Sequence, residues 1–197
     1  MSNSKGYIIG NQYSCYFLTF TIVGWVDLFS RKECRDIIIE SLKYCKKNKG
    51  LNVHAYVVMT NHIHLVLSAE ENSAGLSNII RDLKTYTAKA LLKWIVGSRK
   101  ESRRNWLKVA FAYHAKFNSN NSKYQVWQQN NRPKECIHPK FTNQKINYIH
   151  NNPVVDGIVD RAEDYCYSSA RSYLAMEGCL LEVDVIDFGC EEGYLGF

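Results

Sequence analysis

The pattern of apolar and polar positions predicts three long strands in the first third of the chain. Residues 13–23, YSCYFLTFTIV, are rich in aromatic and β-branched residues and predict a central strand. Residues 51–59 predict a second strand. The short polar pair Thr60-Asn61 then predicts a hairpin turn into a third strand from His62 to Ser68.

Helical periodicity follows in three places. Apolar residues recur at spacings of three and four over residues 31–48, and again over 76–95, so each stretch predicts an amphipathic helix. A third helix is predicted over 139–151, where Pro153 is expected to stop it. A short helix at 106–114 and a fourth strand at 124–129 complete the expected elements.

This order of elements predicts an α+β fold, a ferredoxin-like antiparallel sheet with helices packed on one face. Its length of 197 residues is that of a single domain spanning 1–197. We expect it to carry a basic insertion around 97–122 and an acidic C-terminal tail at 177–197. No stretch has the length of a membrane span or a signal-peptide core, which predicts a cytoplasmic, nucleoid-associated protein.

Cysteine content and charge narrow the class of protein further. The seven cysteines form no C-x-x-C pair and are odd in number, so we expect reduced thiols. Net charge is +6, but the tail 177–197 holds six acids and no Lys or Arg, so the first 176 residues carry +12. A body this basic favours a polyanionic partner. Four basic residues beside Trp106 suit a strand-binding surface or equally a solvated loop; they are Arg99, Lys100, Arg103 and Arg104.

The strand from His62 to Ser68 carries the first candidate chemistry. A period of two sends its residues to opposite faces, with Ile63, Leu65 and Leu67 on one and His62, His64 and Val66 on the other. Two imidazoles about 6 to 7 Å apart on one face can converge on a single cation. A histidine on a strand is also often a satisfied or solvated polar residue, so the pair alone leaves both interpretations open.

The helix predicted over 139–151 carries the second. Ile146 and Ile149 mark its buried side, and Tyr148 lies at the edge of that side, on a face shared with Gln144 and Asn152. A tyrosine followed one turn later by an amide is a nucleophile with a third metal ligand, or an ordinary amphipathic helix end.

Five segments, in this order, resemble the REP-associated tyrosine transposases, single-tyrosine members of the HUH endonuclease superfamily that are related to small insertion-sequence transposases. The resemblance spans about residues 7–175. It weakens in the basic insertion and in the acidic tail. The segments are YFLTFTIV, AYVVMTNHIHLVL, IIRDLKTYTAK, VWQQNNRP and YIHNNPVVDGIV.

The resemblance implies a ferredoxin-like nuclease that cleaves and rejoins single-stranded or hairpin DNA through a 5′-phosphotyrosine intermediate. It implies that His62 and His64 hold Mg²⁺ or Mn²⁺, that Tyr148 is the nucleophile, and that Asn152 completes the metal shell. The residue before a proline is biased away from helical geometry, which weighs against Asn152 as a ligand.

Arg81, Lys84 and Lys145 are expected to contact DNA phosphates, and Trp127 is expected to stack on a base. Surface charge or core packing explains each of these side chains equally well. The expected partner is single-stranded or hairpin DNA, with repeats flanking the protein's own gene as the expected target, and the protein is expected to be a monomer or homodimer. Two other functions stay open: a non-catalytic nucleic-acid-binding module, such as a repressor or RNA binder, and a phosphohydrolase that uses water.

Overall fold

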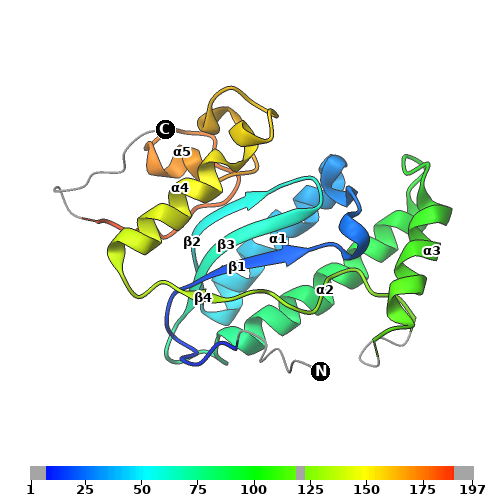
Figure 1. Ribbon diagram of the computed structural model, residues 1–197, viewed down its shortest axis with the longest axis horizontal. Coiled ribbons are helices and arrows are strands. Elements are labelled where there is room, and N and C mark those ends of the chain that lie inside the picture. Colours follow the sequence, from blue (N-terminus) through cyan, green and yellow to red (C-terminus); the bar gives the residue numbers. More distant parts are fainter. Residues whose placement is uncertain (1–7, 119–122, 189–197) are drawn as a thin grey trace, which may run out of the picture.

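A four-stranded antiparallel sheet lies at the centre of the computed structural model, which describes residues 8–118 and 123–188 (Figure 1). Its strand order is β2-β3-β1-β4. The strands are β1 (Tyr16–Thr21), β2 (Leu51–Val58), β3 (His62–Ala69) and β4 (Lys134–Glu135). The predicted hairpin is confirmed, since β2 and β3 pair antiparallel on either side of residues 59–61. The antiparallel α+β class is confirmed with it.

Pairing between β1 and β3 sets what each sheet face displays. The register places Thr19 opposite His64 and Thr21 opposite His62. Because side chains alternate along a strand, Thr19, Thr21 and Phe17 share the face of the two histidines. This face is therefore partly apolar and needs a cover.

Helices cover both faces of the sheet (Figure 1). The long helices α1 (Lys32–Lys49) and α2 (Leu76–Gly97) pack against each other on one face. Helix α4 (Pro139–Val155) lies on the other face and contacts β2 and β3. The expectation of helices on one face holds only for α1 and α2. Phe17 and Val66 on the histidine face are buried, which requires a third helix there.

Residues 124–129 do not form the fourth strand that their composition predicts. Within this segment Trp127 forms an isolated β-bridge with Ile22, the residue just after β1. The edge strand of the sheet is β4 instead, which pairs with Tyr16 and Phe17. Val126 and Trp127 are buried, so their apolar character reflects core packing rather than a continuous ladder.

Helix α4 continues through Pro153, where the sequence predicts its end. A proline inside a helix removes one backbone donor, but Pro153 is buried and its own carbonyl accepts a hydrogen bond from the Ile158 N–H. The amide N–H of Asp156 bonds the Asn152 carbonyl in helical fashion. Asn152 is thus helical, one turn beyond Tyr148.

Shorter elements fill the ends and connections. The short helix predicted at 106–114 in the insertion is α3, which extends over Arg104–Ala115. The other short segments are η1 (Val23–Trp25), η2 (Leu28–Ser30), η3 (Ala162–Asp164) and α5 (Ala170–Tyr173). No helix in the described ranges is long and apolar enough to cross a membrane. Insertion residues 119–122 and tail residues 189–197 lie outside the described residues.

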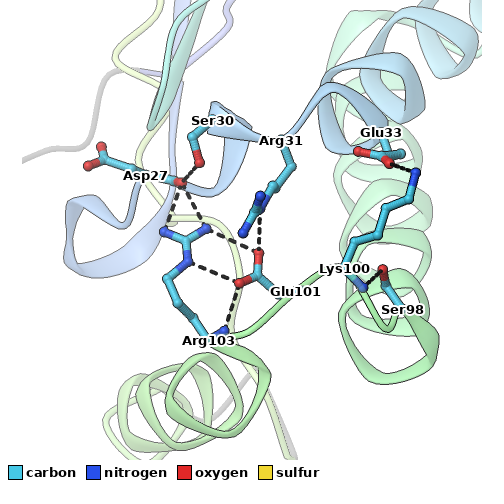
Figure 2. A network of polar contacts seen from close by, with 8 residues as sticks. All are labelled: Asp27, Ser30, Arg31, Glu33, Ser98, Lys100, Glu101 and Arg103. Carbon is cyan, nitrogen blue, oxygen red and sulfur yellow. Dashed lines mark hydrogen bonds and ion pairs between the residues drawn. The ribbon is translucent and has the colours of Figure 1, made fainter.

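The basic segment before α3 binds the protein itself (Figure 2). Glu101 is fully buried and accepts hydrogen bonds from the guanidinium groups of Arg31 and Arg103. Burial alone would raise the pKa of Glu101, but these bonds outweigh it and lower the pKa to about 2. Arg103 also donates to the Asp27 carbonyl. Arg103, predicted among the strand-binding cations, thus fastens α3 to the loop at Asp27.

His150 makes the stability of the fold depend on pH. This side chain of α4 is fully buried, 2.7 Å from Ser169 Oγ, and burial lowers its pKa to about 3. The unfolded chain takes up a proton at this histidine below about pH 6.5, and the folded chain does not. Lowering the pH from 7 to 5 should therefore cost about 2 kcal/mol of unfolding free energy from His150 alone.

Urea unfolding at the two pH values measures this loss. The variant His150→Gln, whose amide can still bond Ser169, should show a pH-dependent loss smaller by about 2 kcal/mol. The exposed His138 supplies the control, because His138→Gln should keep the wild-type dependence. An unchanged dependence in His150→Gln would contradict the assignment.

Candidate active site

His62 and His64 stand side by side at the start of β3, on the sheet face that α4 covers. Their ring centroids are 4.7 Å apart. Burial lowers the pKa of both rings, that of His64 to about 3, with the charges of His62 and Lys145 acting in the same direction on His64. Both imidazoles are therefore neutral at pH 7, the form in which histidine binds a metal ion.

His64 is held between β1 and α4. Its Nδ1 lies 3.0 Å from Thr19 Oγ1, and its Nε2 lies 3.3 Å from the Tyr148 hydroxyl. Phe17 stacks on the ring at a centroid distance of 5.5 Å. An Nδ1–H donated to Thr19 leaves the Nε2 lone pair directed at the tyrosine side of the site.

A chain of two polar side chains orients His62. Asn61 Nδ2 donates to the Asp27 carboxylate at 3.0 Å, which turns its Oδ1 toward His62 Nδ1 at 2.8 Å. An amide oxygen accepts only, so Nδ1 carries the proton and Nε2 carries the lone pair. The sequence predicts Asn61 only as a turn residue, and its contact with His62 is not apparent from the pattern. Its position next to the histidine motif is the only sequence signal for it.

Tyr148 projects from α4 toward the two histidines and remains half exposed, at 47 %. Its ring packs edge-on against Phe17 and His64 at centroid distances of 6.0 and 5.1 Å. Lys145, one turn earlier, places its ammonium 5.7 Å from the Tyr148 ring centroid. The hydroxyl is thus held next to a histidine nitrogen and is open to solvent on one side.

A pocket of about 550 Å³ opens beside this tyrosine, and most of its lining residues belong to α4, with four amide side chains among them. Asn152 and His62 both line this pocket. Burial lowers the pKa of His62, and the Asp156 charge and a hydrogen bond with Asn152 offset only part of that decrease. The structure therefore brings together four predicted residues, His62, His64, Tyr148 and Asn152. The lining consists of His62, Gln144, Asn147, Tyr148, Asn151, Asn152, Val155 and Asp156.

Comparison with known families decides the identity. The family model "Transposase IS200 like" matches residues 26–152, more than half of the chain, and this range includes His62, His64, Tyr148 and Asn152. The chain belongs to the IS200-like transposase family. It is thereby a DNA-binding transposase of the single-tyrosine HUH nuclease class.

One solved structure agrees with this family in fold, and a second shows a weaker similarity. A REP-associated tyrosine transposase bound to a REP hairpin is 19% identical over 98% of both chains, with a TM-score of 0.62. A putative transposase from Deinococcus radiodurans R1 is 21% identical over 47% of this chain and 68% of that chain, with a TM-score of 0.34. No curated protein matches the sequence.

The donor set of this IS200-like transposase fits a divalent cation, which HUH nucleases generally use. No cluster of three His, Cys, Asp or Glu side chains exists in the described part of the chain, and the polar side chains beside His62 in the pocket are mainly amides. Asn147 Oδ1 in the same pocket is buried and has no hydrogen-bond partner among the described residues. Neutral imidazoles and amide oxygens are suitable ligands.

Two of the predicted DNA contacts of the transposase lie elsewhere. Trp127 is buried, packs edge-on against Phe20 and donates its Nε1–H to Thr87, so its face is closed to a base. Lys84 donates to the Gln128 carbonyl and to Asn131, and burial lowers its pKa to about 8. Both side chains serve the core in this structure, which disagrees with their predicted DNA contacts.

The other two predicted contacts are accessible. Arg81 is exposed on α2, where it pairs with the adjacent Asp82. Lys145 lies beside Tyr148 and also covers the ring of Phe17 at 5.4 Å. Of the four predicted cations and aromatics, only Lys145 is next to the site.

Proposed function

We propose that this transposase cleaves and rejoins single-stranded or hairpin DNA with Tyr148 as nucleophile, in a site where His62, His64 and Asn152 hold Mg²⁺ or Mn²⁺. The observation that carries the proposal is the 3.3 Å between the Tyr148 hydroxyl and His64 Nε2 within one chain. A nucleophile and the donors of a metal site are thereby within reach of one phosphate.

In the proposed reaction the Tyr148 phenolate oxygen bonds to phosphorus as the bond to the 3′-oxygen breaks. The products are a 5′-phosphotyrosine link and a 3′-oxyanion, which takes up a proton from solvent to become a free 3′-OH. A bound divalent cation would polarise the phosphate. A free phenol has a pKa of about 10, so the Tyr148 hydroxyl must lose its proton before it attacks. Water on the solvent-exposed side of the pocket can accept this proton.

Other side chains of the protein position the nucleophile and the two metal-binding histidines. Phe17 and the α4 backbone fix the Tyr148 ring, and Asn61 and Thr19 fix the two imidazoles. His62 and His64 act as ligands, because one Nε2 lone pair cannot bind a cation and accept the phenol proton together. Rejoining reverses the step, with a 3′-OH attacking the phosphotyrosine.

Hairpin DNA is the substrate that we propose to test first. The related REP-associated transposase is bound to a REP hairpin, and the first 176 residues of this chain carry a net charge of +12. The cognate DNA would be the inverted repeats that flank the protein's own gene. The protein would act on this DNA in the cytoplasm, as a monomer or homodimer.

Adduct formation tests the proposal. The full-length protein is incubated with a hairpin oligonucleotide that carries these flanking repeats, with Mn²⁺ or with EDTA, and run on a denaturing gel. We expect a covalent protein–DNA species in Mn²⁺ only, with the modified tyrosine mapped to Tyr148 by mass spectrometry. Cleavage without an adduct would instead support the water-using phosphohydrolase. Binding without cleavage would support the non-catalytic module.

A further inference from the structure

The loop after β1 presents a tryptophan next to the site. Trp25 is 59 % exposed, and its ring centroid lies 6.2 Å from that of His62. A large apolar ring is normally buried where the fold allows it. Trp25 also precedes the segment that the family model matches, 26–152, so the family match assigns it no role.

The backbone holds this ring outward. Trp25 has φ of +54°, a left-handed conformation that non-glycine residues seldom adopt, and it follows Gly24 at +65°. Val23 and Val26 on either side are buried, and they anchor the loop. A Cβ at Gly24 would lie 2.9 Å from His114 Nε2, so α3 packs directly on the loop. Trp25 is therefore a fixed exposed ring.

The surroundings of Trp25 suit a nucleic acid better than an apolar protein groove. The adjoining pocket is lined by amides, Gln144, Asn147, Asn151 and Asn152 among them, which can bond the edges of bases. Two residues after His114, the side chain that packs against Gly24, the chain carries an exposed cation, Lys116. Aromatic rings beside cations are the usual platform for single-stranded bases.

We propose that Trp25 is a stacking site for an unpaired nucleobase of single-stranded DNA, adjacent to the nucleotide whose phosphate reaches His62 and Tyr148. This rests on the proposed function for the position of the phosphate. Stacking on the Trp25 face would hold the strand flanking the cleavage point in an unpaired, extended form. The contact tolerates any base, because every base has a π-face.

Two ligands separate stacking from electrostatic binding. They are a fluorescent 12-nucleotide oligo(dT) and an abasic strand of the same length, which has the same phosphates and no bases. Affinities are measured by fluorescence anisotropy in EDTA, so that cleavage and metal binding do not contribute. We expect Trp25→Ala to weaken oligo(dT) binding about 5- to 150-fold and to leave binding of the abasic strand unchanged.

Three further variants make the test decisive. Trp25→Phe should retain most of the affinity, and Trp25→Gly, which suits the left-handed backbone, should lose as much as Trp25→Ala. Tyr44→Ala is the matched control, because Tyr44 is equally exposed, at 59 %, but lies on α1 on the other face of the sheet, and it should leave both affinities unchanged. Unchanged oligo(dT) affinity in both Trp25→Ala and Trp25→Gly, or an equal loss for the abasic strand, would overturn the proposal.

The outcome is also separate from that of the adduct experiment. Adduct formation with unchanged oligo(dT) affinity in Trp25→Ala would reject the stacking site and keep the nuclease. Loss of stacking without any wild-type adduct would keep the base site and reject the nuclease. Light scattering tests whether the Trp25 ring instead contacts a second copy of the protein. If Trp25→Ala dissociates a dimer and leaves oligo(dT) affinity unchanged, the ring lies in a dimer interface and the proposal fails.

Discussion

Replacing Tyr148 with phenylalanine is expected to abolish the covalent DNA adduct and to lower strand cleavage by at least about 10³-fold. The substitution removes the hydroxyl that lies 3.3 Å from His64 Nε2 and keeps the ring that packs on Phe17 and His64. Folding and DNA binding should therefore remain near wild type. A cleavage time course on denaturing gels, with anisotropy for binding, measures both effects.

A second tyrosine provides the control for this loss. Tyr86 is 64 % exposed on α2, on the far face of the sheet, so Tyr86→Phe should cleave at the wild-type rate. An adduct of undiminished yield in Tyr148→Phe would show that another nucleophile is used. It would also contradict the assignment of the phosphotyrosine.

Asn61→Ala is expected to weaken Mn²⁺ binding about 10- to 100-fold, the usual effect of removing a residue that orients a metal ligand. Without the Asn61 oxygen nothing in the described structure fixes the proton on His62 Nδ1, and the ring can turn or change tautomer. The Asn61 backbone carbonyl still accepts from Ile22, so the hairpin turn should persist. Calorimetric titration of Mn²⁺ into the DNA-free protein gives the affinity.

Two observations distinguish orientation from a general loss of structure. In the metal-free protein, ¹⁵N NMR of the imidazoles should show His62 as the Nδ1–H tautomer in wild type and as a mixture in Asn61→Ala. Asn78→Ala, which removes an exposed amide on α2, is the control and should leave Mn²⁺ affinity unchanged. Equal Mn²⁺ affinity in Asn61→Ala and wild type would refute the role of the amide.

Periodicity was sufficient for most of the long elements, including the hairpin that carries the two histidines. The β2–β3 hairpin, α1 and α2 lie within a few residues of where alternation and helical spacing predict them. Alternation also correctly put His62 and His64 on one face. It could not locate β4, because two residues have no period, and it could not distinguish the strand predicted at 124–129 from a buried loop.

Side-chain roles that depend on tertiary packing were less accessible. Lys84 and Trp127 have the composition of DNA contacts, but burial between α2 and the loop at 124–131 gives them intramolecular partners. Asn61 looked like a turn residue because its two partners, Asp27 and His62, are distant from each other in sequence. Tyr148 was singled out by family resemblance. Its helix face alone fitted an ordinary amphipathic helix equally well.

The tyrosine and both histidines lie together within one chain of this structure, so we expect strand cleavage to be first order in the protein. With Tyr148 already beside His64 of the same molecule, a lone copy holds every protein group that we assign to strand cleavage. The rate of cleavage per molecule at saturating DNA should thus not change on dilution of the protein. Any step that does slow with dilution must be one that joins two DNA ends held by separate copies.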